Sequence, residues 1–214
     1  MSQTTANIIA HSRCSITGKE IVTWELVYPR LIHSEFMTHR VFSRNAASSR
    51  AIPLKKMIEL IKNETAYPSE WGKNKSGMQS DGEVDNVTKA SAKYIWDRAR
   101  DSAIESALKL DKLGLHKQVI NRLLEPFQMI KTVMTATELD NWFWLRDHSD
   151  ADPTIHELAS KMWQALESST AVILRPGDWH TPYYGDGFWK DSGYMGKNME
   201  AVFNKRDSTS TLKN

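Results

Sequence analysis

Clusters of β-branched and aromatic residues near the start of the chain predict a β-hairpin. Two short runs of such residues, 7–16 and 20–27, flank a Thr-Gly-Lys turn at 17–19. Strands favour these side chains, and a glycine supplies the backbone freedom that a tight turn requires. Pro29 ends the second strand, because proline has no N–H for a sheet hydrogen bond. The chain therefore opens with an antiparallel strand pair.

Residues 30–42 have helical spacing but no polar face. At about 100° per residue their apolar side chains fall on all sides, so Glu35, His39 and Arg40 cannot all reach water. Residues 43–50 contain no large apolar side chain and predict a loop. Pro53 suits the first turn of a helix that runs to about Lys62.

A polar stretch, 63–85, follows with three glycines and one proline. Unstructured connections of this length are uncommon in compact domains. We therefore expect a mobile functional lid or a variable insertion here.

Helical periodicity dominates the rest of the chain. A long amphipathic helix with Ile95 in its apolar stripe is predicted over 88–113, where Gly114 suits the C-terminal cap. A second helix over 115–124 should end before Pro126, and residues 127–135 predict another strand. Further helices are expected over 138–146 and from Pro153, before a loop-rich tail at 175–214. Residues 1–214 thus predict a single α+β domain.

Composition narrows the class of protein. The 214 residues are 40% hydrophobic and 25% charged, with a mean hydropathy of -0.51, which is typical of a globular protein. No apolar run approaches the ~20 residues of a membrane span, and residues 1–7 lack a secretory pattern, so we expect a cytoplasmic protein. The net charge of +2 is too small to indicate nucleic-acid binding. Cys14, the only cysteine, excludes an internal disulfide.

The densest polar cluster lies at 43–50. Its alanines would let a ligand approach the backbone, its serines donate hydrogen bonds, and Arg44 and Arg50 carry planar forks that match phosphate oxygens. This composition predicts either an anion site or a solvated turn.

Three other candidates stay open. His39 is either an acid–base group or a hydrogen-bonded core residue. Arg146 follows three aromatic residues and either extends to the surface or projects into a pocket. The stretch from His156 resembles a metalloprotease helix, but Ser160 replaces the second metal ligand, so we expect no metal site.

The polar cluster also carries a family signature. Thr38-His39-Arg40, followed after seven residues by Ser48 and then by Arg50, resembles the motif of flavin-dependent thymidylate synthases, normally Arg-His-Arg, seven residues, Ser. Two further segments, 121–126 and 141–146, resemble the second and third segments of that family and occur in the same order.

The resemblance implies a flavoenzyme with an antiparallel sheet flanked by helices. FAD would be reduced by NADPH, take a one-carbon unit from methylenetetrahydrofolate and deliver it to C5 of dUMP. Family members are homotetramers with shared active sites, and no membrane or nucleic-acid partner is implied. The resemblance also implies the roles of individual residues. The residues expected at the flavin are His39, Arg40, Asn45, Asn141 and Arg146. Those expected at the nucleotide are Glu35, Ser48, Ser49, Arg50, Arg122 and Arg146, and the catalytic residues are Arg146, His39 and Ser48.

Several positions depart from the family pattern. Thr38 replaces an arginine, and Glu35 replaces a glutamine that contacts the nucleotide. An ionised Glu35 would repel a phosphate, so it is protonated, paired with an arginine or turned elsewhere. A carboxylate can also accept from the amine of cytosine, so dCMP as substrate and hydroxymethylation of dUMP or dCMP are alternatives.

The family's N-terminal helical hairpin, with its flavin-binding His-x-Thr/Ser-Pro element, has no counterpart before the first strand. A similar element, Trp179-His180-Thr181-Pro182, lies near the other end. We hypothesise that His180 and Thr181 take the missing element's place at the flavin, as in a circular permutation. The alternative is a surface tail.

Two other functions remain in competition. A module that binds nucleic acid through its arginines and tryptophans would be colourless, and its binding would be sensitive to salt. A homologue that binds flavin without turnover would be coloured but inactive.

Overall fold

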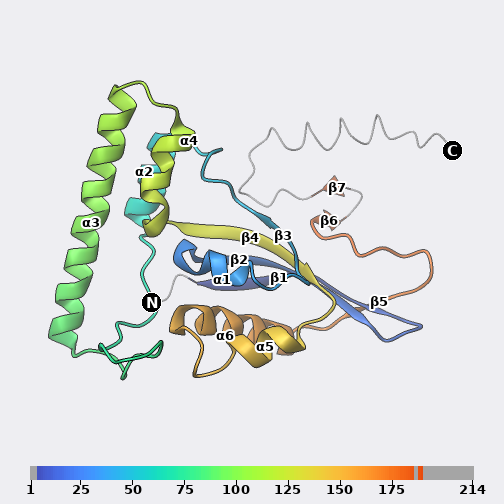
Figure 1. Cartoon of the computed structure of the whole chain (residues 1–214). Coiled ribbons are helices and arrows are strands. Elements are labelled where there is room, and N and C mark those ends of the chain that lie inside the picture. The colour runs from blue at the N-terminus through green and yellow to red at the C-terminus, as the bar shows by residue number, and fades with distance from the viewer. Residues whose placement is uncertain (1–3, 186–187, 190–214) are drawn as a thin grey trace.

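A computed structural model describes residues 4–185 and 188–189, and its centre is a five-stranded sheet (Figure 1). The strands lie in the order β3-β4-β2-β1-β5. Their bounds are Thr5–Cys14 for β1, Glu20–Pro29 for β2, Ser43–Ala46 for β3, Met129–Ala136 for β4 and Val172–Leu174 for β5. Neighbouring strands are antiparallel, except that β5 runs parallel to β1. The predicted α+β class is confirmed, and β5 is a strand that the sequence did not reveal.

The hairpin of β1 and β2 forms where it was predicted. Gly18 in its turn has a φ of 69°, a conformation that costs little only for glycine. Along β2, Trp24, Leu26 and Tyr28 are fully buried, and the residues between them point to the other face. The strand therefore has one core face.

Two predictions for residues 30–50 are wrong. The helix expected over 30–42 is only a 3-10 turn, η1 (Arg30–Ile32), and one helical turn, α1 (His33–Phe36). Beyond this turn, the carbonyl groups of Phe36 and His39 accept hydrogen bonds from the Arg44 guanidinium. Residues 43–46, expected as a loop, form β3, since the edge of β4 supplies backbone partners that need no apolar side chain.

A helical layer stands beside one end of the sheet (Figure 1). It consists of α2 (Leu54–Asn63), α3 (Asn86–Lys112), α4 (Lys117–Ile120) and the 3-10 helix η2 (Asn121–Phe127). The helices predicted after Pro53 and over 88–113 are confirmed. The helix expected over 115–124 is only the single turn α4, and η2 continues through Pro126. At its end, the Gln128 N–H donates to the Glu125 carbonyl at 3.2 Å.

The helical layer has its own apolar core. On α2 the buried positions repeat at helical spacing, whereas α3 buries only Ile104 and Ala107. Ile95, which the periodicity placed in the buried stripe, is 66% exposed. The buried members of this core are Leu54, Met57, Ile61, Ile104, Ala107, Ile120, Leu124 and Phe127.

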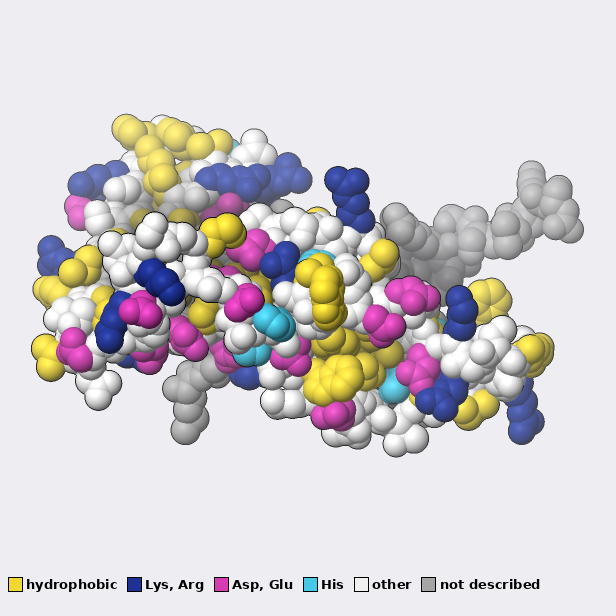
Figure 2. All heavy atoms as spheres, turned by 60° about the horizontal axis from the view of Figure 1, so that its bottom comes forward, with side chains coloured by type: hydrophobic (Ala, Val, Ile, Leu, Met, Phe, Trp, Pro, Cys, Tyr) yellow, Lys and Arg dark blue, Asp and Glu magenta, His cyan; other side chains and the backbone are white. Residues whose placement is uncertain are grey.

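Two helices cover one face of the sheet, α5 (Asp140–Arg146) and α6 (Pro153–Glu167) (Figure 1). Both were predicted. Asp152 caps α6 by accepting from the Thr154 N–H at 2.8 Å. Figure 2, in which this side comes forward, shows apolar side chains exposed among charged ones. Trp144 and Trp163, on α5 and α6, are 75% and 42% exposed.

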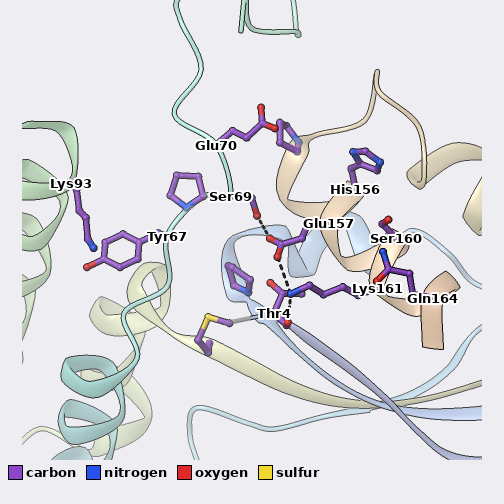
Figure 3. Close-up of a pocket in the computed structure, with 14 residues that line it drawn as sticks. Thr4, Tyr67, Ser69, Glu70, Lys93, His156, Glu157, Ser160, Lys161 and Gln164 are labelled. Atoms are coloured by element: carbon purple, nitrogen blue, oxygen red, sulfur yellow. Dashed lines mark hydrogen bonds and ion pairs between the residues drawn. The ribbon is translucent and has the colours of Figure 1, made fainter. Parts of the chain in front are cut away.

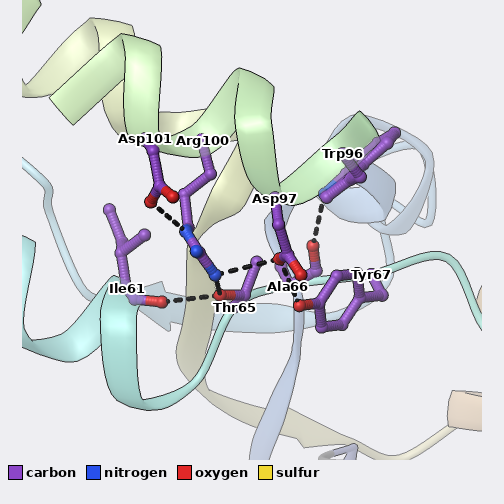
Figure 4. A network of polar contacts seen from close by, with 8 residues as sticks. All are labelled: Ile61, Thr65, Ala66, Tyr67, Trp96, Asp97, Arg100 and Asp101. Carbon is purple, nitrogen blue, oxygen red and sulfur yellow. Dashed lines mark hydrogen bonds and ion pairs between the residues drawn. The ribbon is translucent and has the colours of Figure 1, made fainter. Parts of the chain in front are cut away.

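The segment between α2 and α3 forms no helix or strand, as predicted, but its beginning is fixed to α3 (Figure 4). The Arg100 guanidinium donates to Thr65 Oγ1 at 2.7 Å and to Asp97 Oδ1 at 2.9 Å. The Tyr67 hydroxyl donates to the same Asp97 oxygen at 2.6 Å. The contacts of Thr65 and Tyr67 fix the beginning of the segment to α3. A mobile lid therefore remains a prediction only for the residues after Tyr67.

The described part of the tail contains a small strand pair, β6 (Tyr184–Gly185) and β7 (Phe188–Trp189). The rest of the predicted loop-rich tail, 190–214, lies outside the described residues. No described helix combines the length and hydropathy that a membrane span requires.

Candidate active site

The structure brings His39, Arg146 and Glu35 together. Arg146 Nε donates to His39 Nε2 at 3.0 Å, and Arg146 Nη1 lies 3.6 Å from Glu35 Oε2. Burial, followed by the charges of Arg146 and Arg44, lowers the pKa of His39. A neutral imidazole that accepts at Nε2 carries its proton on Nδ1. His39 therefore orients the guanidinium of Arg146.

Trp142 sets this geometry from the core. Its ring lies edge-on to the rings of His39, at 4.7 Å, and of Phe36, at 5.5 Å. Arg146 follows Trp142 by one helical turn, so the two side chains leave α5 on the same side. The apolar packing of α5 thus decides where Arg146 meets His39.

Glu35 was expected to be protonated, paired with an arginine or turned elsewhere, and it is paired with an arginine. The side chains of Glu35 and Arg146 are 44% and 23% exposed. A pair this open to water contributes little stability. Its main effect is local, since it places an acceptor beside the guanidinium.

Arg44, considered for either an anion site or a solvated turn, has a structural contact. On β3 it points toward the sheet's core face, where Nη1 donates to the carbonyl oxygens of Phe36 and His39. Its guanidinium also lies 6.0 Å from the centre of the Phe36 ring. Arg44 therefore holds the turn that carries His39.

The loop after β3 is anchored through Ser49. This side chain is buried, and its hydroxyl donates to Glu125 Oε1 at 2.6 Å. The Asn121 amide donates to the Ser49 carbonyl at 2.7 Å, and Arg122 Nη1 reaches the same Glu125 oxygen at 3.0 Å. Ser49 and Arg122, assigned to the nucleotide from separate segments, thus meet at one carboxylate.

Five other predicted site residues are not brought into direct contact with this cluster. Their side chains are exposed and make no hydrogen bond or ion pair within the described residues. They are Arg40, Asn45, Ser48, Arg50 and Asn141.

The tail docks on the sheet face opposite α5 and α6 through His180. Its Nδ1 lies 2.9 Å from Ser12 Oγ on β1, and its Nε2 lies 2.9 Å from Thr23 Oγ1 on β2. Both ring nitrogens are therefore used within the protein. Thr181, the next residue, is exposed.

A separate cavity lies elsewhere. It has a volume of about 700 Å³ and opens between α3, one side of α6 and residues 67–70 (Figure 3). No predicted site residue lines it. Its polar groups are largely engaged with each other, since Glu157 accepts from Ser69 and pairs with Lys161 at 3.0 Å. We place the candidate site at His39 and Arg146 because the motif residues meet there.

Sequence reasoning missed Arg30 and Tyr28. Arg30 Nη2 lies 3.1 Å from Glu125 Oε1, and the Tyr28 hydroxyl lies 2.9 Å from His33 Nδ1. No pattern along the chain marked either residue, because both contacts depend on how η1 packs. Among the described residues, no group of three or more His, Cys, Asp or Glu is placed to hold a metal.

The sequence matches a family model over residues 2–170, more than three quarters of the chain. That family is described as Thy1, thymidylate synthase complementing protein. The chain belongs to the flavin-dependent thymidylate synthases. The tail that carries His180 lies beyond the matched residues. No curated protein is similar enough to count as a relative.

The fold of this family member is also that of solved structures. It is similar to the UMP/dUMP methylase PolB from Streptomyces cacaoi bound with 5-Br dUMP, with 16% identity and a TM-score of 0.64 over 82% of this chain and 93% of that one. The same methylase bound with 5-Br UMP gives 16% identity and a TM-score of 0.62 over 82% and 92%. At this identity the likeness establishes the fold.

Proposed function

We propose that this thymidylate synthase family member transfers a one-carbon unit from methylenetetrahydrofolate to C5 of a deoxypyrimidine monophosphate, with dUMP to dTMP as its reaction. The observation that carries the proposal is the contact of Arg146 with a neutral His39, formed between two segments that resemble the family's motifs. Membership of the family supports an enzyme that acts on pyrimidine nucleotides.

Arg146 is the residue to which we assign the pyrimidine. With Nε held by His39 and Nη1 paired with Glu35, Nη2 is available to face the ring carbonyls. A fixed positive group there stabilises negative charge that develops in the ring as C5 and C6 react. His39 acts through Arg146, so we regard it as a positioning residue.

The nucleotide's phosphate is assigned to the loop after β3 and to η2. Ser49 and Arg122 already converge on one point, and Ser48 and Arg50 extend from the same loop. Guanidinium and hydroxyl donors are the groups that bind phosphate oxygens most strongly. Arg50 and Ser48 can also serve a neighbouring subunit if the protein is a homotetramer.

Three exposed side chains near the candidate site have donors that suit FAD. Arg40, Asn45 and Asn141 offer a guanidinium and two amides with no partner among the described residues, which suits a diphosphate and the polar edge of an isoalloxazine. We assign them, with Arg146 and His39, to the cofactor. Bound FAD would supply the redox chemistry, with NADPH as reductant.

The tail is proposed to complete a flavin site that is shared between subunits, because His180 lies on the sheet face opposite α5, which carries Asn141 and Arg146. Both ring nitrogens of His180 bind the sheet, so His180 positions Thr181, whose side chain is exposed. If Thr181→Ala and His180→Ala leave the affinity for FAD unchanged, the circular permutation is wrong.

Glu35 supports a second candidate. Its carboxylate lies 3.6 Å from Arg146, beside the group assigned to the pyrimidine, and could accept from the exocyclic amine of cytosine. Action on dCMP, or hydroxymethylation of either nucleotide, is therefore the alternative reaction. A nucleic-acid module loses support because the chain belongs to an enzyme family and Arg44 is turned inward.

A visible spectrum followed by product analysis tests the proposal. We expect purified protein with FAD to show a flavin band, and to convert dUMP in the presence of methylenetetrahydrofolate and NADPH. Product mass distinguishes methyl from hydroxymethyl addition, and a parallel reaction with dCMP tests the alternative. Arg146→Ala should abolish turnover, while Arg175→Ala, in the exposed tail, should not. A colourless protein that converts neither nucleotide would refute the proposal.

A further inference from the structure

One oxygen atom of Glu125 collects three donors from three elements. Oε1 accepts from Ser49 Oγ at 2.6 Å, from Arg122 Nη1 at 3.0 Å and from Arg30 Nη2 at 3.1 Å. The side chains of Glu125 and Arg30 are 21% and 17% exposed, so the contact is mostly shielded from water. Two guanidinium groups and one carboxylate leave the cluster with an excess of one positive charge.

Arg30 has a donor to spare. Its Nη1 is buried and has no hydrogen-bond partner among the described residues. A buried donor without a partner is costly, and a charged one more so. The cluster therefore offers more donors than the single Glu125 oxygen uses.

Two guanidinium groups and a hydroxyl hold the carboxylate oxygen of Glu125. The same donors would also hold a phosphate oxygen, which would occupy the same position. Two of these donors, Ser49 and Arg122, were assigned to the nucleotide by the family resemblance. Their partner on η2, Glu125, carries the same sign of charge as that phosphate. The two anions therefore require the same groups.

We propose that Glu125 is a built-in competitor of the nucleotide's phosphate. Phosphate takes the donors of Ser49 and Arg122, and the carboxylate turns to the spare Nη1 of Arg30, which keeps its charge compensated. Arg30 and Glu125 thus set how strongly the site binds an anion. The identity of the nucleotide rests on the proposed function, whereas the competition for an anion does not.

Removing the charge of Glu125 should tighten nucleotide binding. Glu125→Gln keeps a carbonyl that can accept from Ser49 but no longer opposes a phosphate. We expect a dissociation constant for dUMP lower by about tenfold, since one like charge at close range is removed. Binding of deoxyuridine, which has no phosphate, should not change. Isothermal titration calorimetry measures both.

The matched control is Glu105→Gln. Glu105 forms an exposed pair with Lys109 on α3, so this variant makes the same charge change away from the cluster. It should bind dUMP as the unchanged protein does. If it tightens binding equally, net charge alone explains the effect and the proposal fails.

A second pair of variants covers a loss of stability in Glu125→Gln, which leaves Arg30 without its anion. Arg30→Met removes that guanidinium, so Glu125→Gln can be added to it without a buried unpaired charge. We expect the double variant to bind dUMP more tightly than Arg30→Met alone. Equal or weaker binding by the folded double variant overturns the competition.

Binding of inorganic phosphate, measured beside binding of dUMP and dCMP, distinguishes a failure of this inference from a failure of the proposed function. If the unchanged protein binds neither dUMP nor dCMP, the assigned substrate is wrong. Glu125→Gln should still bind phosphate more tightly than the unchanged protein does. If dUMP binds but neither ligand is affected by Glu125→Gln, the competition fails and the substrate assignment stands.

Discussion

At the scale of single residues, the arrangement of Arg146 depends on the charge state of its neighbour. His39 can accept from the guanidinium only while its Nε2 carries no proton. Its lowered pKa, caused first by burial, keeps it neutral at physiological pH. Protonation would place two cations in contact and release Arg146.

The first prediction concerns pH. The folded pKa of His39 lies below its ordinary value of 6.5, and those of His33 and His180 are lowered as well, in each case first by burial. The unfolded chain therefore binds more protons as the pH falls below about 7, so stability decreases in that range. We expect Tm to fall from pH 7.5 to pH 5, and to fall less in His39→Gln. An equal fall in that variant would remove His39 as a cause.

The second prediction concerns Arg44. Arg44→Met removes the charged donor from the carbonyl groups of Phe36 and His39, which keep only long backbone hydrogen bonds of 3.4 Å and 3.3 Å, so we expect a loss of about 2–3 kcal/mol in the free energy of unfolding. Arg44→Lys keeps one charged donor and should lose less. Urea denaturation measures both, and a fully stable Arg44→Met would contradict the role assigned to this side chain.

At the scale of elements, α5 joins the core to the candidate site. Trp142 is 1% exposed and packs on Phe36, His39 and Phe42, whereas Trp144 on the same helix is 75% exposed. One helix thus carries a matched pair of tryptophans, one inside the core and one outside.

The third prediction uses this pair. Trp142→Ala should destabilise the protein by about 3–5 kcal/mol, because it opens a cavity between α5 and the sheet. Trp144→Ala should change stability by no more than about 0.5 kcal/mol. Thermal or urea unfolding measures the difference. Similar losses in the two variants would show that the packing of α5 is misassigned.

Elements with a clear repeat could be predicted, and those without one could not. The hairpin, the helices after Pro53 and Pro153 and the long helix follow from local spacing and caps. Strands β3 and β5 have few residues and owe their form to a neighbouring strand's backbone. The side chains of β3 are polar or small, and the Val-Ile-Leu run of β5 is too short to predict a strand by itself.

At the scale of the whole molecule, two apolar cores lie side by side. One joins the sheet to α5 and α6, and the other joins α2, α3 and η2. The network around Arg100 ties the chain that leaves α2 back to α3 (Figure 4). The candidate phosphate cluster, built from η1, the loop after β3 and η2, lies between these two parts.

The fourth prediction concerns that tie. Arg100→Met removes the donor shared by Thr65 and Asp97, so residues 64–85 should open more often and be cut faster by a protease. Arg98→Met, at an exposed position of the same helix, is the control. Mass spectrometry of the fragments locates the cuts. Equal cleavage of the two variants would show that the network does not hold this segment.

Of the candidate site, the sequence identified residue types but not their contacts. His39, Ser49, Arg122 and Arg146 were marked by a family resemblance, and the structure places them in two clusters. Arg44 was considered for an anion site or a solvated turn, and it binds backbone carbonyl groups instead. An arginine satisfies either role, and only its surroundings decide between them.

The sequence by itself determined the hairpin, the main helices and the family, because spacing, caps and motif residues are local properties of the chain. Only the tertiary structure decided that the helix after Pro29 stops at Phe36, that β5 joins β1 and that Glu125 meets Arg30. The physical reason is that each of these depends on a partner outside its own element. Backbone groups and buried charges take the partners that the fold brings to them.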